Sequence, residues 1–270
     1  RCEFEQNVSA VAVPVFAAGG IAAAALELTV TDLHADQRLA QSVLTVAARG
    51  VSRELSTGTN ATYFAVSTEQ LAQARTHRMP LIHAVGWPRE RQWHDALEQL
   101  CDSVAALSSL PANVHEVCRR LRGSQPELLE TQADALLAAQ GLGIDAAAAP
   151  FVMAALQVYW VDLASRLGAD DVTELDVPGV CPVCGTLPVA SVVRTDNRSQ
   201  GYRFLHCALC ATEWHMVRIK CSQCEATRDV TYHSIEGGSE AIRAESCDSC
   251  RTYRKILYQE KDAGVEPVAD

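Results

Sequence analysis

Cys181-Pro-Val-Cys184 is the first of four Cys-x-x-Cys pairs that decide how this chain folds, followed by Cys207-Ala-Leu-Cys210, Cys221-Ser-Gln-Cys224 and Cys247-Asp-Ser-Cys250. In both halves of this stretch 22 residues separate the two pairs, and the whole pattern repeats after 40 residues. Two thiolates on one tight turn, faced by a second such turn, form a tetrahedral cage of four sulfur atoms that suits zinc or a single iron. The stretch therefore predicts two related metal-binding modules that arose by tandem duplication.

The sequence leaves open which pairs share a metal. The repeat favours sequential grouping, first pair with second and third with fourth, and cross-braced or nested groupings stay as alternatives. Gly185, directly after the first pair, lets the backbone turn so that amide groups face the sulfurs. Each module has only about 40 residues, too few for a self-sufficient core, so a metal would supply most of its folding free energy. Loss of one ligand is therefore expected to unfold the local ribbon.

Upstream of the cysteines, the apolar residues recur with the period of amphipathic helices. A capping box at Ser67–Gln70 opens the first clear helix, which runs to about His77. Further helices are predicted over about 88–107, 111–123, 126–141 and 145–168, with one more over 36–56. Short loops between them favour antiparallel packing as a bundle. The apolar run from Val11 to Leu28 is interrupted by Pro and Gly, so we interpret it as an Ala-rich surface or edge segment rather than a membrane span.

After an acidic linker the pattern changes to short β-strands, predicted over about 189–193, 202–205, 214–219, 230–235, 241–245 and 253–258. The predicted fold class is α+β, with an N-terminal all-α helical bundle followed by two tandem small β modules of the rubredoxin or zinc-ribbon kind. The expected boundaries are a helical domain over 1–169, a linker over 170–179, a first four-cysteine metal-binding module over 180–220, a second over 221–262 and a tail over 263–270.

The net charge and the absence of several catalytic motifs narrow the range of functions that the sequence supports. The net charge of −10 disfavours a nucleic-acid-binding zinc-ribbon protein, since phosphate binding needs a basic field. Phosphate-binding Gly-rich loops, His-Glu-x-x-His and Gly-x-Ser-x-Gly are all absent from the sequence, which favours a binding protein over an enzyme. Disulfides would compete with metal for the paired cysteines, but an acidic, helix-rich chain without a secretory signal disfavours them.

Several other side chains are candidates for lesser roles. His206 and His215 flank the second pair and are candidates for supporting the ligands or for contacting a partner, as is Trp214, whose commoner role is to plug the core of the ribbon. The three unpaired cysteines, Cys2, Cys101 and Cys118, are interpreted as small buried residues. The strand arginines are expected on solvated faces, with an acidic partner as the alternative: Arg203, Arg218, Arg243 and Arg254.

Longer runs around the cysteines resemble the FdhE family of formate dehydrogenase accessory proteins. The runs that carry the resemblance are Cys181-Pro-Val-Cys-Gly-Thr-Leu-Pro-Val-Ala-Ser, Tyr202-Arg-Phe-Leu-His-Cys-Ala-Leu-Cys-Ala-Thr-Glu-Trp-His-Met-Val-Arg-Ile-Lys, Cys221-Ser-Gln-Cys-Glu and Ile242-Arg-Ala-Glu-Ser-Cys-Asp-Ser-Cys. The resemblance covers about residues 178–262 and continues more weakly upstream through Met79-Pro-Leu and the helices between Pro126 and Trp160.

The resemblance implies a cytoplasmic maturation factor rather than an enzyme. Such a protein would bind the catalytic subunit of respiratory formate dehydrogenase before export, and would itself form a homodimer. It would carry two rubredoxin-like metal centres, with iron as the expected metal and zinc as the alternative, held by the eight paired cysteines: Cys181, Cys184, Cys207, Cys210, Cys221, Cys224, Cys247 and Cys250. A rubredoxin-like electron-transfer protein is the alternative function.

Overall fold

The structure is a computed structural model that describes residues 66–108, 110–138, 143–173, 175–195, 201–234, 236–265 and 267, and the backbone of two strands within residues 9–30. By compactness the chain divides into two units that do not follow chain order. The first takes residues 1–64 and 88–159, and the second takes residues 65–87 and 160–268. The segment 65–87 therefore folds with the cysteine-rich half, across about 90 residues of intervening chain.

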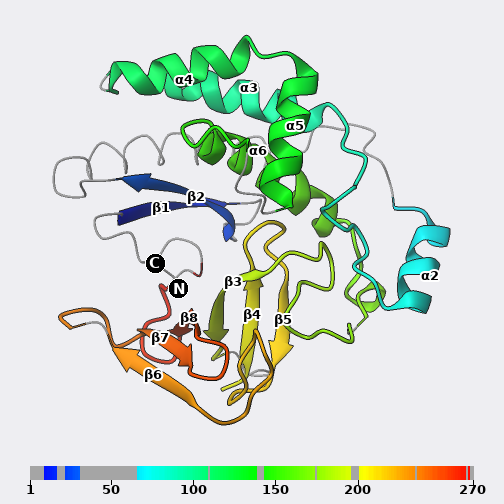
Figure 1. Ribbon diagram of the computed structural model, residues 1–270, viewed down its shortest axis with the longest axis vertical. Helices are drawn as coiled ribbons and strands as arrows, with labels where there is room; N and C mark the ends of the chain where they lie inside the picture. The colour runs from blue at the N-terminus through cyan, green and yellow to red at the C-terminus, as the bar shows by residue number, and fades with distance from the viewer. Residues whose placement is uncertain are drawn as a thin grey trace. The chain divides into compact units, whose positions relative to one another are not determined.

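Two strands near the N-terminus correct the expectation of an all-α first half. Strand β1 (Ser9–Phe16) pairs antiparallel with β2 (Ala22–Val30), from Ser9 opposite Val30 to Phe16 opposite Ala22 (Figure 1). The signal was present in the alternation of valine with small residues in Val11-Ala-Val-Pro-Val15, which has the period of a strand. The helix expected over 36–56 and Cys2 lie outside the described residues.

The helices of the first unit agree with the sequence pattern. They are α3 (Gln92–Ala105), α4 (Ala112–Arg122), α5 (Pro126–Leu137) and α6 (Ala149–Ser165), of which α6 continues into the second unit. Their apolar stripes are buried, with Trp93 and Trp160 fully enclosed, and Cys101 and Cys118 are buried as well. The indole Nε1 of Trp93 donates to Glu130 on α5 over 2.8 Å.

Arg89 ties the start of this helical region to α5. Its side chain is only 4% exposed, and its Nε donates to Glu130 over 2.8 Å while a second nitrogen lies 2.6 Å from Asp134. Burial lowers the pKa of the Arg89 guanidinium, but the two carboxylates outweigh it and hold that pKa above its ordinary value. Because the cation is buried between two carboxylates, removing either partner would leave a buried charge poorly compensated, which is costly.

Helix α2 (Thr68–His77) begins with the predicted capping box, in which Ser67 and Gln70 exchange hydrogen bonds of 2.9 and 3.1 Å. The same helix holds the acidic linker, which enters the short 3-10 helix η1 (Ala169–Asp171). Arg75 lies 2.6 Å from the carboxylate of Asp171, and Arg78 pairs with Asp176. The linker is therefore fixed to α2 at two points.

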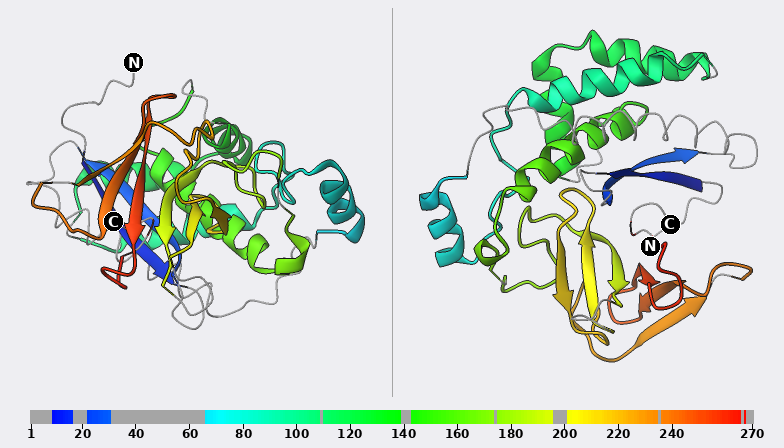
Figure 2. Two further views of the ribbon diagram at one scale, coloured as in Figure 1. Left: turned by 90° about the horizontal axis from the view of Figure 1, so that it is seen from below. Right: turned by 180° about the vertical axis from the view of Figure 1, so that it is seen from behind.

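The cysteine-rich half forms one six-stranded sheet rather than two separate ribbons. Its strands are β3 (Pro188–Val193), β4 (Arg203–Cys207), β5 (Glu213–Met216), β6 (Val230–Ser234), β7 (Ile242–Cys247) and β8 (Thr252–Tyr258), close to the six predicted ranges. The order across the sheet is β5-β4-β3-β8-β7-β6. In Figure 2 the yellow strands of the first cysteine module (β3 to β5) and the orange-to-red strands of the second (β6 to β8) lie in this order.

Parallel pairing of β3 with β8, from Ala190 opposite Lys255 to Val193 opposite Tyr258, joins the two antiparallel halves. These two strands are central, and their apolar runs are buried: Val192 and Val193 on β3, and Ile256 and Leu257 on β8. A run buried on both faces is typical of a central strand, so the near-continuous apolar stretch Val189–Val193 was the available signal. Joining the halves removes two exposed strand edges and supplies a shared core that neither ribbon has alone.

The last described residues complete this core. Val265 is 3% exposed and packs in a cluster with Ala190, Ala241 and Leu257. The segment beginning at residue 263, expected from the sequence to be a tail, thus contributes a side chain to the core of the sheet.

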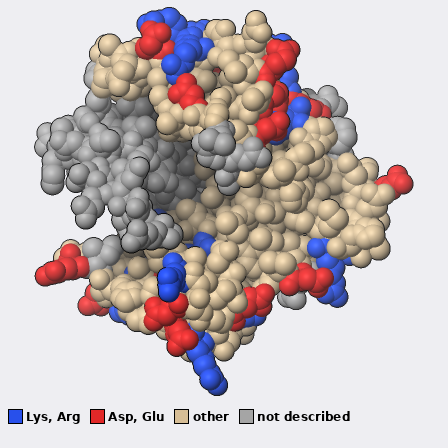
Figure 3. All heavy atoms as spheres, viewed as in Figure 1, with Lys and Arg blue, Asp and Glu red and all other residues tan. Residues whose placement is uncertain are grey.

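No helix in the described parts of the chain is long and apolar enough to cross a membrane. On the face shown in Figure 3, basic and acidic side chains are interspersed among large uncharged areas. This face therefore presents no continuous field of one sign.

Candidate metal centres

The eight paired cysteines gather into two groups of four, in the sequential grouping that the repeat favours. The first group is Cys181, Cys184, Cys207 and Cys210, the second is Cys221, Cys224, Cys247 and Cys250, and within each group all sulfur atoms lie within 4.8 Å of one another. Four thiolates at about 2.3 Å from an ion at the centre of a tetrahedron would lie about 3.8 Å apart.

The sulfur separations fit such a cage. The Sγ–Sγ distances are 3.5 Å for Cys181–Cys210 and 3.3 Å for Cys184–Cys207 in the first group, and 3.6 Å for Cys221–Cys250 and 3.7 Å for Cys224–Cys247 in the second. A disulfide would bring two sulfurs to about 2.05 Å, and all eight cysteines are free thiols. Both groups therefore have the donor set and spacing for one thiolate-bound ion each.

One backbone turn is repeated at all four pairs. The residue after the second cysteine has a positive φ in each case: Gly185 at 76°, Ala211 at 58°, Glu225 at 62° and Arg251 at 57°. In three of the four turns the amide of this residue donates to the carbonyl of the first cysteine over 2.8–3.0 Å. Left-handed backbone at a residue other than glycine costs about 1–3 kcal/mol, so three of the turns store strain that a bound ion would offset.

Backbone amides donate to sulfur at the second and third cysteine pairs. The amides of Leu209 and Cys210 donate to Cys207 Sγ over 3.3 and 3.4 Å, and the amide of Gln223 donates to Cys221 Sγ over 3.4 Å. Burial would raise the pKa of the Cys207 thiol, but the surrounding thiols and the Cys210 amide outweigh it and hold that pKa well below the ordinary value. The first group is therefore arranged to carry at least one thiolate.

Threonine hydroxyls add a second set of contacts to sulfur. Thr186 Oγ1 lies 3.1 Å from both Cys184 and Cys207, Thr212 Oγ1 lies 3.1 Å from Cys210, and Thr252 Oγ1 lies 3.0 Å from Cys250. Burial would raise the pKa of Cys250, but the contacts from Thr252 outweigh it and lower that pKa. In the sequence these threonines form the longer pattern Cys-x-x-Cys-x-Thr. The cysteine spacing alone did not point to them.

A segment from far upstream lies over the first centre. The amides of Leu81, Ile82 and Ala84 donate to the carbonyls of Pro182, Val183 and Cys184 over 3.4, 2.8 and 2.8 Å, respectively. This clasp, defined here as residues 79–87, is itself held where Trp160 Nε1 donates to the Ile82 carbonyl over 3.3 Å. The sequence placed this segment among the helices, and only the tertiary structure brings it to the cysteines.

The clasp explains why the first turn alone uses glycine. A Cβ atom on Gly185 would come within 2.8 Å of His83 Cδ2 and 3.1 Å of Pro80 Cγ. The other three turns tolerate side chains at the same left-handed position. Gly185 is therefore needed for close packing of the clasp as well as for its φ.

The three supporting candidates lie beside the first module and outside both sulfur groups. His206 on β4 is 7% exposed, and its Nδ1 lies 3.1 Å from Glu213. Trp214 donates from Nε1 to the Pro178 carbonyl over 2.8 Å, and His215 is exposed with edge contacts to Tyr202 and Phe204.

Trp214 also lines a hollow of about 270 Å³ between β5 and the segment leading to the first cysteine pair. The hollow is mostly apolar, and its lining includes Leu175, Val177, Met216 and Val217. Val177 and Val217 are each 57% exposed. An exposed apolar hollow of this kind marks a surface that can bind another polypeptide.

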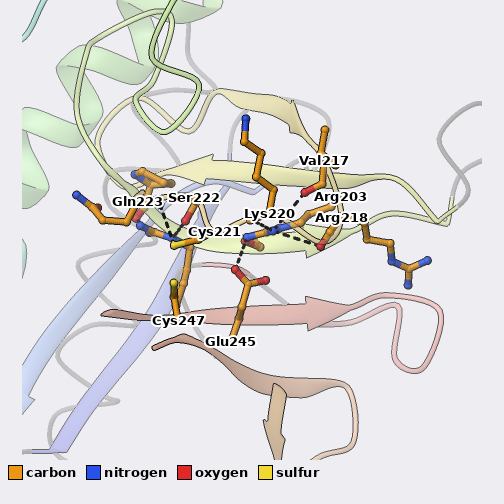
Figure 4. A network of polar contacts seen from close by, with 12 residues as sticks. Arg203, Val217, Arg218, Lys220, Cys221, Ser222, Gln223, Glu245 and Cys247 are labelled. Carbon is orange, nitrogen blue, oxygen red and sulfur yellow. Dashed lines mark hydrogen bonds and ion pairs between the residues drawn. The ribbon is translucent and has the colours of Figure 1, made fainter. Parts of the chain in front are cut away.

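Arg203 joins the two modules and corrects the expectation of solvated strand arginines. It lies on β4, is 1% exposed and donates to Glu245 on β7 over 2.8 Å, to Ser191 over 2.9 and 3.1 Å, and to the Lys220 carbonyl over 2.8 Å. Figure 4 shows its guanidinium between the Glu245 carboxylate and the carbonyls that precede Cys221. Burial raises the pKa of Glu245 above its ordinary value, and the charge of Arg203 opposes that rise.

Arg254 is also turned inward, where Nε donates to Ser222 Oγ over 2.7 Å and another nitrogen to the Pro188 carbonyl. Ser222 lies within the third cysteine pair, and Pro188 begins β3. Both arginines therefore satisfy backbone or side-chain oxygens where the two modules meet, which single-strand patterns do not reveal.

Most of the chain matches models of one known protein family. Residues 52–176 match the N-terminal domain of FdhE, residues 180–218 its central domain and residues 219–270 its C-terminal domain. The crystal structure of the FdhE protein from Pseudomonas aeruginosa superposes with a TM-score of 0.76 at 33% identity, covering 87% of this chain and 81% of that chain.

Two curated relatives are similar over the same region. A Protein FdhE homolog from Cronobacter sakazakii is 46% identical over 201 residues, which cover 74% of this chain and 63% of that protein. Another from Enterobacter sp. is 43% identical over 204 residues, covering 75% of this chain and 65% of that protein. The matched region thus spans a little under two thirds of the length of these relatives.

Proposed function

The chain belongs to the FdhE family, and from this premise we propose that it is an accessory protein for the maturation of respiratory formate dehydrogenase. In this role it binds the catalytic subunit of that enzyme in the cytoplasm and catalyses no reaction of its own. The observation that carries the proposal is the pair of four-cysteine groups, which fit two thiolate-bound ions within the part of the chain that matches the family.

The apolar hollow beside β5 supports a role in binding a polypeptide. It combines exposed aliphatic side chains with an indole, and aromatic side chains are enriched at protein interfaces. We propose that the catalytic subunit contacts this hollow, and that the protein acts as a homodimer.

Retention of the catalytic subunit by the tagged chain tests the accessory role and the assignment of the hollow as the docking surface. Val217→Glu places a charge at the hollow and is expected to abolish retention, whereas Leu128→Glu on α5 is a matched control because Leu128 is similarly exposed, at 54%. Retention equal to wild type in Val217→Glu removes the hollow as the docking surface. If the wild-type chain fails to retain any formate dehydrogenase subunit, the accessory role itself is wrong.

We propose that the two groups hold iron, with zinc as the alternative. Either ion would cross-link its module, and iron would also supply a one-electron couple. Anaerobic purification followed by metal analysis distinguishes iron from zinc. About two irons per chain, with thiolate-to-iron absorption in the visible spectrum, would support iron. Two zincs in a colourless protein would make the centres structural.

A rubredoxin-like electron-transfer protein is the second candidate. The observation that favours it is the exposure of Cys224, which leaves one edge of the second centre open to a redox partner. This function requires reversible bleaching of the visible absorption at a physiological potential. A protein whose spectrum does not change on reduction, or that binds only zinc, excludes it.

A further inference from the structure

The two sulfur groups differ in how far solvent reaches them. All four cysteines of the first group are buried, at 0–3% exposure, and the clasp covers their first turn. In the second group Cys221 and Cys247 are buried, Cys250 is partly exposed and Cys224 is exposed. Among the four cysteine turns, the backbone hydrogen bonds described for residues 79–87 reach the first, at Pro182, Val183 and Cys184.

The turn that carries Cys224 also lacks a contact present in the other three. Where those turns have Thr186, Thr212 and Thr252 two residues after the second cysteine, this turn has Ala226. Each threonine hydroxyl lies 3.0–3.1 Å from the sulfur of its turn. Hydrogen bonds to a thiolate stabilise it and lower its reactivity, so the methyl group of Ala226 leaves Cys224 the least protected of the four.

We propose that Cys224 is the exchangeable ligand of the second centre, where the thiol of another molecule reaches the bound ion. With an ion held by Cys221, Cys224, Cys247 and Cys250, the sulfur of an incoming thiol would take the place of Cys224. The incoming thiol would lose one proton to solvent and Cys224 would take one up, so charge would be conserved and no electron transferred. All four cysteines of the first group are buried, so an ion bound there would serve to hold the fold.

This inference rests on both groups holding ions and not on the identity of the client. Metal content is therefore measured first on the purified chain. A chain without bound ions would overturn the metal centres themselves, whereas two bound ions with equal reactivity would overturn only the assignment of Cys224.

Limited alkylation of the metal-loaded protein with iodoacetamide, followed by peptide mapping, ranks the cysteines by reactivity. Cys224 is expected to react first, at least about tenfold faster than any cysteine of the first group. Ala226→Thr restores the missing hydroxyl and is expected to slow this reaction about fivefold, and Thr252→Ala is the matched reverse, expected to speed reaction at Cys250 by a similar factor. Equal rates in the two groups, or faster reaction in the first, overturn the proposal.

Chemical rescue tests whether an external thiol can occupy the position of Cys224. In Cys224→Ala the second ion is expected to be retained when 2-mercaptoethanol or a short cysteine-containing peptide is supplied, and native mass spectrometry should show the added thiol. Cys184→Ala is the matched control at the buried centre and should gain no ion from either thiol. Rescue by the small thiol alone identifies a low-molecular-weight ligand, and rescue by the peptide as well identifies a protein thiol. Failure of both thiols, or equal rescue in the two variants, contradicts the proposal.

Discussion

Individual residues at the turns show how one local motif is adapted to different surroundings. All four turns share the left-handed residue, but Gly185 alone meets packed atoms, from His83 and Pro80 of the clasp. The sequence marked Gly185 because glycine permits this backbone. The need for close packing on its Cα became apparent only with the clasp in place.

Gly185→Ala is expected to lower the free energy of unfolding of the metal-loaded protein by about 2–4 kcal/mol, because a φ penalty adds to a steric clash. Gly237→Ala is the control, since Gly237 also has a positive φ, of 73°, but no atom lies within 4 Å of its added Cβ. That control should lose only about 1 kcal/mol. Urea unfolding followed by circular dichroism measures both, and equal losses would remove the packing role of the clasp.

The buried pair of Arg203 and Glu245 leads to a second prediction for single residues. Arg203→Met leaves the Glu245 carboxylate buried without a cation, which is expected to cost about 3–5 kcal/mol of unfolding free energy. Adding Glu245→Gln to that variant removes the unpaired charge and should restore part of the loss. If denaturant unfolding shows Arg203→Met within about 1 kcal/mol of wild type, the pair does not hold the modules together.

At the scale of the element, the strands of the first module are joined by side chains as well as by backbone. Glu213 on β5 accepts from Arg194 Nε over 3.0 Å and lies 3.1 Å from His206 on β4. Burial alone would raise the pKa of Glu213, but the hydrogen bonds from His206 and Arg194 outweigh it and hold that pKa below its ordinary value. The carboxylate therefore stabilises the folded state in its charged form.

A depressed pKa in the folded state gives stability that is present above the unfolded pKa of about 4.3 and is lost as the pH falls through the folded value. Glu213→Gln should therefore destabilise the protein at neutral pH by about 1–2 kcal/mol, and its difference from wild type should shrink as the pH falls below about 4. Glu236→Gln, at an exposed carboxylate, is the control for the loss of one negative charge. Unfolding free energies of wild type and both variants are measured from neutral pH to below about 4. If the difference between wild type and Glu213→Gln stays constant with pH, the Glu213 carboxylate is not the source of this stability.

At the scale of the whole molecule, the shared sheet changes the expected effect of losing one cysteine from a sulfur group. The sequence predicts that a lost ligand unfolds only its own ribbon. Because β3 of the first half pairs with β8 of the second, we now expect damage to cross between the halves. The Arg203–Glu245 pair, which joins β4 to β7, strengthens this coupling.

Hydrogen exchange with mass spectrometry tests the coupling. Cys207→Ser, which removes a ligand of the first group, should reduce amide protection in β8 as well as in β3 and β4. Cys247→Ser should in turn reduce protection in β3. If each substitution affects only the strands of its own half, the two halves unfold independently despite the shared sheet.

The sequence by itself determined the positions of the helices from α2 onward and of the six strands from β3 to β8, and the eight paired cysteines, and it favoured their sequential grouping, which the structure shows. These features depend on local causes: helical and strand periodicity, capping, turn chemistry and the spacing of a repeat. The cysteine spacing, with the runs around it, was also enough to identify the family, which the comparisons confirmed.

Only the tertiary structure decided that the halves share one sheet, that the clasp covers the first centre, that Arg203 is buried, and that Cys224 faces solvent. Each depends on which surfaces meet across long stretches of chain. The sequence pattern of a strand does not identify the strand that pairs with it. Two identical cysteine spacings also do not show which of the two sulfur groups a distant segment will cover.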